Sequence, residues 1–175
     1  GKWDFLPGTM DAAAQDAERI LAETGDPQLA DFRLDRAYFE ELLSLAESTK
    51  CAYLVEYVRA MIDAANLRSL VRTLRMHKDA AFLRRVLFEG GTVSVSELMR
   101  RGPGGNVAEL FRSTVLRDAA AAGEQAVGGG SLTEFEKLCD DAVLLTAGKA
   151  RRVPFGVEVA IGYVAAREAE LTAVR

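Results

Sequence analysis

The sequence predicts an all-α fold, and three observations lead to that prediction. No stretch alternates apolar and polar residues for long enough to form a strand. Aromatic residues make up only 7% of the chain, whereas alanine and leucine are plentiful, and this composition favours helix over sheet. The stretch from Tyr53 to Met76 contains neither glycine nor proline and is rich in strong helix formers. We therefore expect one long helix here, against which the other helices pack.

The long predicted helix changes its apolar side halfway along. Its first half gathers apolar residues on one face, namely Leu54, Val58, Met61, Ile62 and Ala65. Its second half places them on the opposite side, namely Leu67, Leu70, Val71 and Leu74. Arg68, Arg72 and Arg75 continue the first face. A helix of this kind must pack against different neighbours at its two ends.

A third strip of the same helix is polar. It contains Arg59, Asp63 and Asn66. Arg59 and Asp63 are four residues apart, so they lie on neighbouring turns and are able to pair.

Shorter helices are expected on both sides of the long one. Before it, we expect one helix over residues 10–24 and a second that begins at Asp31 or Asp35 and runs through Ala46. After it, we expect a helix over residues 79–88 and another that is capped by Ser94 or Ser96 and ends at Arg100. Further along, we expect a helix capped by Asn106 through Val115 with an alanine-rich continuation, a helix over 131–145, and a last helix from Phe155 past the end.

The cluster Arg101-Gly102-Pro103-Gly104-Gly105 is the strongest break in the sequence. We place an internal boundary there, which divides the chain into residues 1–101 and 102–175. A weak repeat supports the division, because Tyr-Phe-Glu-Glu-Leu at 38–42 precedes the long helix and Phe-Glu-Lys-Leu at 135–138 precedes the last helix. We expect two similar helical lobes in tandem.

Charge and composition exclude several classes of function. The net charge of −4 argues against a nucleic-acid-binding protein, which is usually basic. No apolar run approaches the roughly 20 residues of a transmembrane helix. Cys51 and Cys139 fit neither a disulfide framework nor a metal-binding spacing, and His77 is the only histidine. The glycine clusters lack the lysine–serine/threonine ending of a phosphate-binding loop. We expect no cofactor, no metal and no catalytic site.

The arginine row and two glutamates are the candidate contact residues. Arg68, Arg72 and Arg75 can bind acidic side chains of a partner protein or carboxylates of this chain itself. Glu168 lies within the apolar stripe of the last helix, and Glu170 lies on its second apolar side. Because burying an unpaired carboxylate is costly, we expect Glu168 to be paired with an arginine inside a bundle. If the last helix is not enclosed, its free side is an interface.

Several segments, taken in order, resemble one known family. They are Phe5-Leu6-Pro7, residues 23–26, residues 34–39, residues 62–75, Phe155-Gly156-Val157-Glu158, and residues 162–171. Together they resemble the C subunit of the V-type (archaeal/bacterial A/V-type) ATPase, the counterpart of the d subunit of the eukaryotic V-ATPase. The resemblance runs the length of this chain and implies that the chain is part of a longer protein. Residues 1–101 would be the middle lobe of three, and residues 102–175 a truncated last lobe.

The resemblance implies a funnel of three helical lobes in the central stalk of a rotary ATPase. Its wide end accepts the rotating shaft, and its base sits on the cytoplasmic face of the membrane rotor ring. Such a stalk protein is peripheral to the membrane, binds no nucleotide, and couples the shaft to the ring during proton or sodium transport. Two alternatives stay open: a helical-repeat binding module unrelated to rotary ATPases, and a small enzyme that uses Glu168 as an acid or base.

Overall fold

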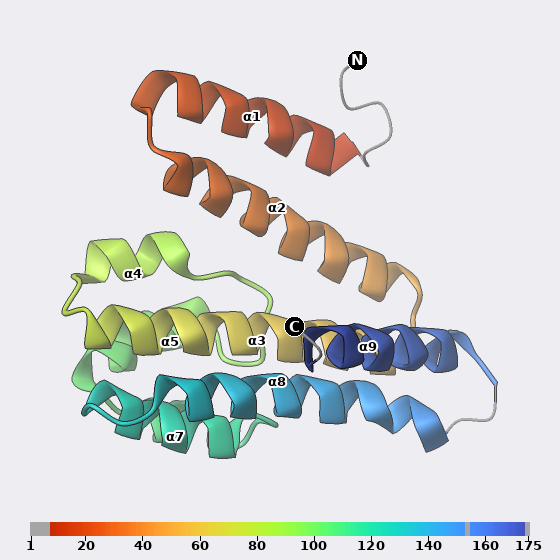
Figure 1. Ribbon diagram of the computed structural model, residues 1–175. Helices are drawn as coiled ribbons and strands as arrows, with labels where there is room; N and C mark the ends of the chain where they lie inside the picture. Colours follow the sequence, from red (N-terminus) through yellow and green to blue (C-terminus); the bar gives the residue numbers. More distant parts are fainter. Residues whose placement is uncertain (1–7, 153–154, 174–175) are drawn as a thin grey trace.

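The computed structural model describes residues 8–152 and 155–173 (Figure 1). Every element in these ranges is helical and none is a strand, so the all-α prediction is confirmed. The helices are α1 (Gly8–Thr24), α2 (Pro27–Ser48), α3 (Ala52–Arg75), α4 (Ala80–Val86), α5 (Val95–Arg101), α6 (Val107–Leu110), α7 (Arg117–Val127), α8 (Leu132–Gly148) and α9 (Val157–Ala173), with short 3₁₀ helices at Gly102–Gly104 and Lys149–Arg152. Residues 5–7, which belong to the family resemblance, lie outside the described ranges. No helix in these ranges has the length and apolar character needed to cross a membrane.

Helices α1 and α2 form a hairpin that stands above the rest of the fold in Figure 1. Alanines at the contact, such as Ala13 and Ala37, are fully buried. The expected start of α2 at Asp31 or Asp35 is wrong, because α2 begins at Pro27. The Asp26 carboxylate accepts a hydrogen bond from the Gln28 N–H at 2.9 Å, and proline is favoured in the first turn of a helix. Asp26 and Pro27 therefore start α2 only two residues after α1 ends at Thr24.

Helix α3 lies at the centre and is buried on different sides in its two halves, as its apolar pattern predicted. In the first half, Leu54, Val58 and Ile62 belong to a small core with Phe88. In the second half, the buried residues Leu67, Leu70 and Val71 join a larger core. That core also contains Leu83, Leu98, Val107, Phe111, Leu116 and Phe135. It draws residues from both sides of the 101/102 boundary, and the division into two lobes stays a prediction.

Two residues of the polar strip of α3, Asp63 and Asn66, form hydrogen bonds with the backbone of the loop that follows α4. The Asn66 side chain is fully buried, donates to the Phe88 carbonyl and accepts from the Phe88 N–H, both at 2.8 Å. Asp63 is also buried and accepts from the Val93 N–H at 3.1 Å. Burial raises the pKa of Asp63, and the hydrogen bonds from Val93 and Thr92 oppose that shift.

The expected Arg59–Asp63 pair is therefore not the main interaction of either residue. Asp63 turns inward toward the loop, and Arg59 Nη2 instead lies 3.9 Å from Glu47 Oε1 on α2. Pairing across one turn of a helix is a weak interaction, and the loop backbone offers Asp63 a buried donor.

Side-chain caps begin the helices around the larger core. The side chains of Asp79, Ser94 and Ser131 accept hydrogen bonds from backbone N–H groups at the starts of α4, α5 and α8. The predicted helix starts at Asp79 and Ser131 are therefore confirmed. Of the two predicted caps Ser94 and Ser96, the structure shows Ser94.

The expected single helix from Asn106 through Val115 is wrong. Helix α6 ends at Leu110, and α7 begins at Arg117. Between them, the Thr114 hydroxyl donates to the Phe111 carbonyl and accepts from the Leu116 N–H, which makes a turn.

Helix α9 packs beside α8 at the end of the described chain (Figure 1). Gly162 makes this close contact possible, because a Cβ at this position would lie 2.7 Å from the Ala150 side chain and 3.1 Å from the Ala147 carbonyl. The Cys51 thiol, 3.4 Å from Glu158 Oε1, joins the start of α3 to the first turn of α9. Ile161 of α9 also packs against the small core around Leu54, Val58 and Ile62.

The buried Asn66 amide allows a test of this packing. Asn66→Ala removes both partners of the Phe88 backbone and leaves two buried polar groups unsatisfied, so we expect it to lower the free energy of unfolding by about 2–4 kcal/mol. Urea unfolding followed by circular dichroism measures the change. Asn106→Ala is the matched control, because this exposed asparagine makes no side-chain cap and its loss should change stability by less than about 0.5 kcal/mol. Equal effects of the two variants would contradict the role of Asn66.

Candidate functional site

The arginine row of α3 pairs with α8 in this chain. Arg68 Nε lies 2.7 Å from Glu136 Oε2, and its Nη2 lies 2.5 Å from Asp140 Oδ1. Arg72 Nη2 lies 2.7 Å from the other oxygen of the same Glu136 carboxylate. One glutamate on α8 thus bridges two arginines on α3. These contacts are the intramolecular alternative that the sequence left open.

Arg75, the third arginine of the row, binds backbone carbonyls. Its Nη1 donates to the carbonyls of Ala126 and Gly130, both at 2.9 Å. These two carbonyls belong to the end of α7 and the turn before α8, where helix carbonyls lack partners within the helix. Through these ion pairs and hydrogen bonds, the three arginines join α3 to the end of α7 and to α8. The Arg72 side chain remains 60% exposed, and its contact with a partner protein stays a prediction.

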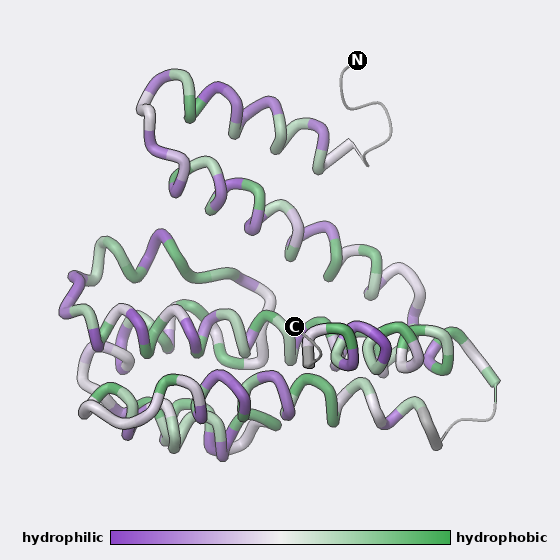
Figure 2. Tube along the Cα trace, viewed as in Figure 1, coloured by the Kyte–Doolittle hydropathy of each residue, from purple (hydrophilic) through white to green (hydrophobic). Residues whose placement is uncertain are grey.

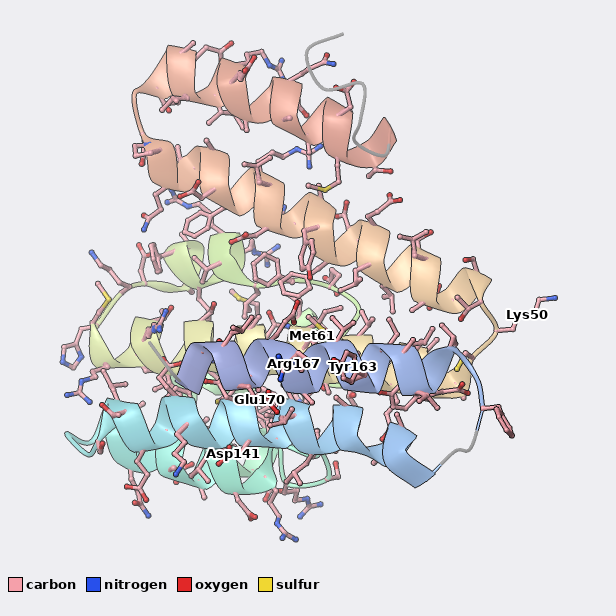
Figure 3. All side chains as sticks on the ribbon, turned by 45° about the vertical axis from the view of Figure 1, so that its right-hand side comes forward. Lys50, Met61, Asp141, Tyr163, Arg167 and Glu170 are labelled. Carbon is pink, nitrogen blue, oxygen red and sulfur yellow. The ribbon has the colours of Figure 1, made fainter. Side chains whose placement is uncertain are left out.

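Glu168 is exposed, so its expected burial against an arginine inside the bundle is wrong. No ion pair joins it to another residue in the part of the chain that the structure describes. Glu170 is also exposed and pairs with Arg167 one turn away on the same helix. Figure 3 labels Tyr163, Arg167 and Glu170 along α9. Both glutamates thus lie on a helix that is open to solvent on more than one side.

Helix α9 is apolar but poorly covered. None of its described side chains is buried. Large apolar side chains on or next to it are exposed, namely Phe155, Val157, Val159, Tyr163, Val164 and Leu171. In Figure 2 hydrophobic positions recur along this helix. Because a folded chain leaves few large apolar patches uncovered unless something binds there, α9 is the candidate contact helix of the molecule.

Two hollows flank α9. One, of about 400 Å³, lies between α8 and α9 and is lined by Asp141, Leu144, Leu145, Gly148, Gly162 and Ala166. We call it the α8–α9 hollow. The other, of about 380 Å³, lies between α2, α3 and α9, and Glu168 is among its lining residues. We call it the α2–α3–α9 groove. The last helix thus separates two apolar depressions.

Sequence reasoning missed most of the residues around these hollows. Leu144 and Leu145 are exposed on α8, and Tyr38 and Tyr57 line the groove from two helices. The exposure of adjacent leucines could have been suspected, since two neighbours on a helix point about 100° apart and cannot both face one core. The meeting of Tyr38, Tyr57 and Glu168 depends on the packing of three helices, and no local pattern predicts it.

Cys139 lies in the core, and His77 lies at the end of α3. Cys139 is buried, and this burial raises the pKa of its thiol to about 12, so the thiol stays protonated at neutral pH. His77 follows α3 with φ of 52°, and its N–H donates to the Leu74 carbonyl while Lys78 N–H donates to Thr73, the pattern of a helix C-terminal cap. Within the described ranges, no group of three or more potential ligands could hold a metal ion.

The thiols give a direct test of this packing. Cys51 is partly exposed, whereas Cys139 is buried and has a raised pKa, so we expect one fast-reacting thiol per native chain. Titration with a chromogenic disulfide reagent at pH 8 should label Cys139 at least about 100 times more slowly than Cys51. Cys51→Ser should remove the fast phase and leave Cys139 to react only after unfolding in guanidinium. Two thiols that react at similar rates in the native chain would contradict the buried position of Cys139.

Comparison with known protein families identifies a family that matches nearly the whole chain. The family described as ATP synthase (C/AC39) subunit matches residues 5–175, which include every described helix. Neither the comparison with curated proteins nor the comparison with solved structures gives a match. The chain therefore belongs to the ATP synthase (C/AC39) subunit family, which confirms its resemblance to the C subunit of the V-type ATPase.

Proposed function

We propose that this chain is a non-catalytic part of the central stalk of a V-type rotary ATPase, where it couples the rotating shaft to the membrane rotor ring. Family membership establishes the chain as a component of a V-type ATP synthase. The proposal adds the place of the chain in the stalk, at the cytoplasmic face of the membrane, and a mechanical role during proton or sodium transport. The shaft subunits and the rotor ring are the partners we propose.

The uncovered apolar surface of α8 and α9 is the observation that supports this role. Leu145 is 75% exposed, and Tyr163 is 66% exposed on the neighbouring helix. Both lie outside the two hydrophobic cores. A connector needs such surfaces, because stable association depends on an apolar centre, and the charged rim around it mainly sets orientation. We propose that the α8–α9 hollow contacts a neighbouring protein of the complex.

A mechanical role also requires a body that holds its shape under load. The shared core along α3 and the arginine contacts between α3 and α8 supply such a body. Torque applied to one helix of the bundle would be passed through packed side chains, because a close-packed core deforms little.

The proposed contact surface can be tested by assembly. Leu145→Asp places a charge in the α8–α9 hollow, so we expect at least a tenfold loss of co-purification with the shaft subunits and the rotor ring when all subunits are co-expressed in the full complex. The variant should still fold, because Leu145 is mostly exposed. Thr133→Asp adds the same charge to the exposed start of α8 and should assemble normally. Normal assembly of Leu145→Asp would contradict the role of this hollow.

Arg72→Glu, in the same assay, tests the sequence-based prediction that the arginine row contacts a partner. Arg72 and Arg68 both bind Glu136, so the substitution also changes a contact within the fold. The thermal unfolding of the Arg72→Glu variant must therefore be recorded in parallel. Loss of assembly with unchanged unfolding would support the arginine surface as a contact, and unchanged assembly would remove it.

A further inference from the structure

The α2–α3–α9 groove has the walls of a helix-binding site. Each helix contributes apolar side chains to it, namely Leu42 and Leu45 from α2, Val58 and Met61 from α3, and Ile161 and Val164 from α9. Leu45 is 52% exposed and Val164 is 51% exposed. Leu45 and Val164 are thus incompletely covered, although both line the groove. The three helices leave room for a further element on their shared side.

The length and shape of the groove fit a short helix. The residues of α2 that line it include Tyr38, Leu42, Leu45 and Thr49, which follow one another at i, i+4, i+7 and i+11. This row covers three turns, about 16 Å along the helix. Rows of this spacing on neighbouring helices form ridges and grooves that accept the side chains of another helix. An amphipathic helix lays its apolar face into such a groove.

The polar groups of the groove indicate the charge of its occupant. Among the lining residues that the structure describes, Glu168 is the only charged one. Tyr38 and Tyr57 lie on the same groove, and burial, followed by the nearby Glu168 carboxylate and Tyr38, raises the pKa of Tyr57. A carboxylate next to two phenol rings suits a lysine or arginine, because the cation gains an ion pair and contact with aromatic faces.

We propose that the α2–α3–α9 groove binds an amphipathic helix of another protein that carries a basic residue. The apolar face of this helix packs on the leucines and valines of the walls. Its lysine or arginine contacts Glu168 between Tyr38 and Tyr57. The groove is separate from the α8–α9 hollow, so the two surfaces let α9 bind different neighbours on its two sides.

The test uses two labelled synthetic helices with the purified chain. Both peptides have 14 residues and the same leucines at helical spacing, but one carries lysines at the edge of the apolar face and the other carries glutamates. Fluorescence anisotropy measures binding. We expect the basic peptide to bind at least ten times more tightly than the acidic one. Leu45→Asp should weaken binding of the basic peptide at least tenfold, and a loss of at most twofold would place the peptide outside the groove.

Matched variants separate the groove from general attraction to an acidic protein. Glu168→Gln should weaken binding of the basic peptide about tenfold. Glu109→Gln removes one negative charge from exposed α6, away from the groove, and should change binding less than twofold. Both substituted side chains are exposed, and circular dichroism confirms that the variants fold.

Four further results would overturn the proposal. These are equal binding of the basic and acidic peptides, equal effects of Glu168→Gln and Glu109→Gln, binding of the chain to anionic lipid vesicles in place of the basic peptide, and self-association that Leu45→Asp abolishes. The last two would assign the groove to a lipid surface or to a second copy of this chain.

Discussion

The fold depends on one constraint, which is that α3 must be buried on different sides in its two halves. Val58 and Ile62 face a small core shared with α2, whereas Leu70 and Val71 face the larger core shared with α7 and α8. A helix with a single apolar stripe could serve only one of these cores. The other side of the second half carries the arginines. Two of them, Arg68 and Arg72, join α3 to Glu136 on α8.

The change of side also explains why polar residues are buried in the middle of α3. Where the apolar stripe moves from one face to the other, Asp63 and Asn66 meet the chain between α4 and α5 and bind its backbone groups. Burial of such groups is tolerable because each finds a partner. These contacts fix the path of the loop across the junction of the two cores. The same helix thus supplies both the apolar packing and the polar contacts that define the centre of the molecule.

Sequence reasoning succeeded where the signal was local and failed where it was not. The all-α class, the two-sided α3 and the helix starts near Asp79 and Ser131 follow from residue types and spacing. The start of α2 was missed because it was expected at Asp31 or Asp35, whereas Asp26 is the cap and proline is in the first turn. The partner of the arginine row could not be decided, since choosing between Glu136 and another protein requires the distance between α3 and α8. The groove was missed for the same reason, because one of its three walls comes from α9, which is far in sequence from α2 and α3.

Helix α9 contrasts with α3, because it is apolar but none of its described side chains is buried. This uncovered helix connects the fold to the proposed role in a larger complex.

Native-state hydrogen exchange of the isolated chain, followed by NMR, tests the account most directly. Amides in both halves of α3, such as those of Val58 and Val71, should exchange at similarly slow rates and at least about 100 times more slowly than the amide of Val164 on α9. Equal protection of α9 and α3, or separate exchange of the two halves of α3, would contradict a single bundle organised around that helix.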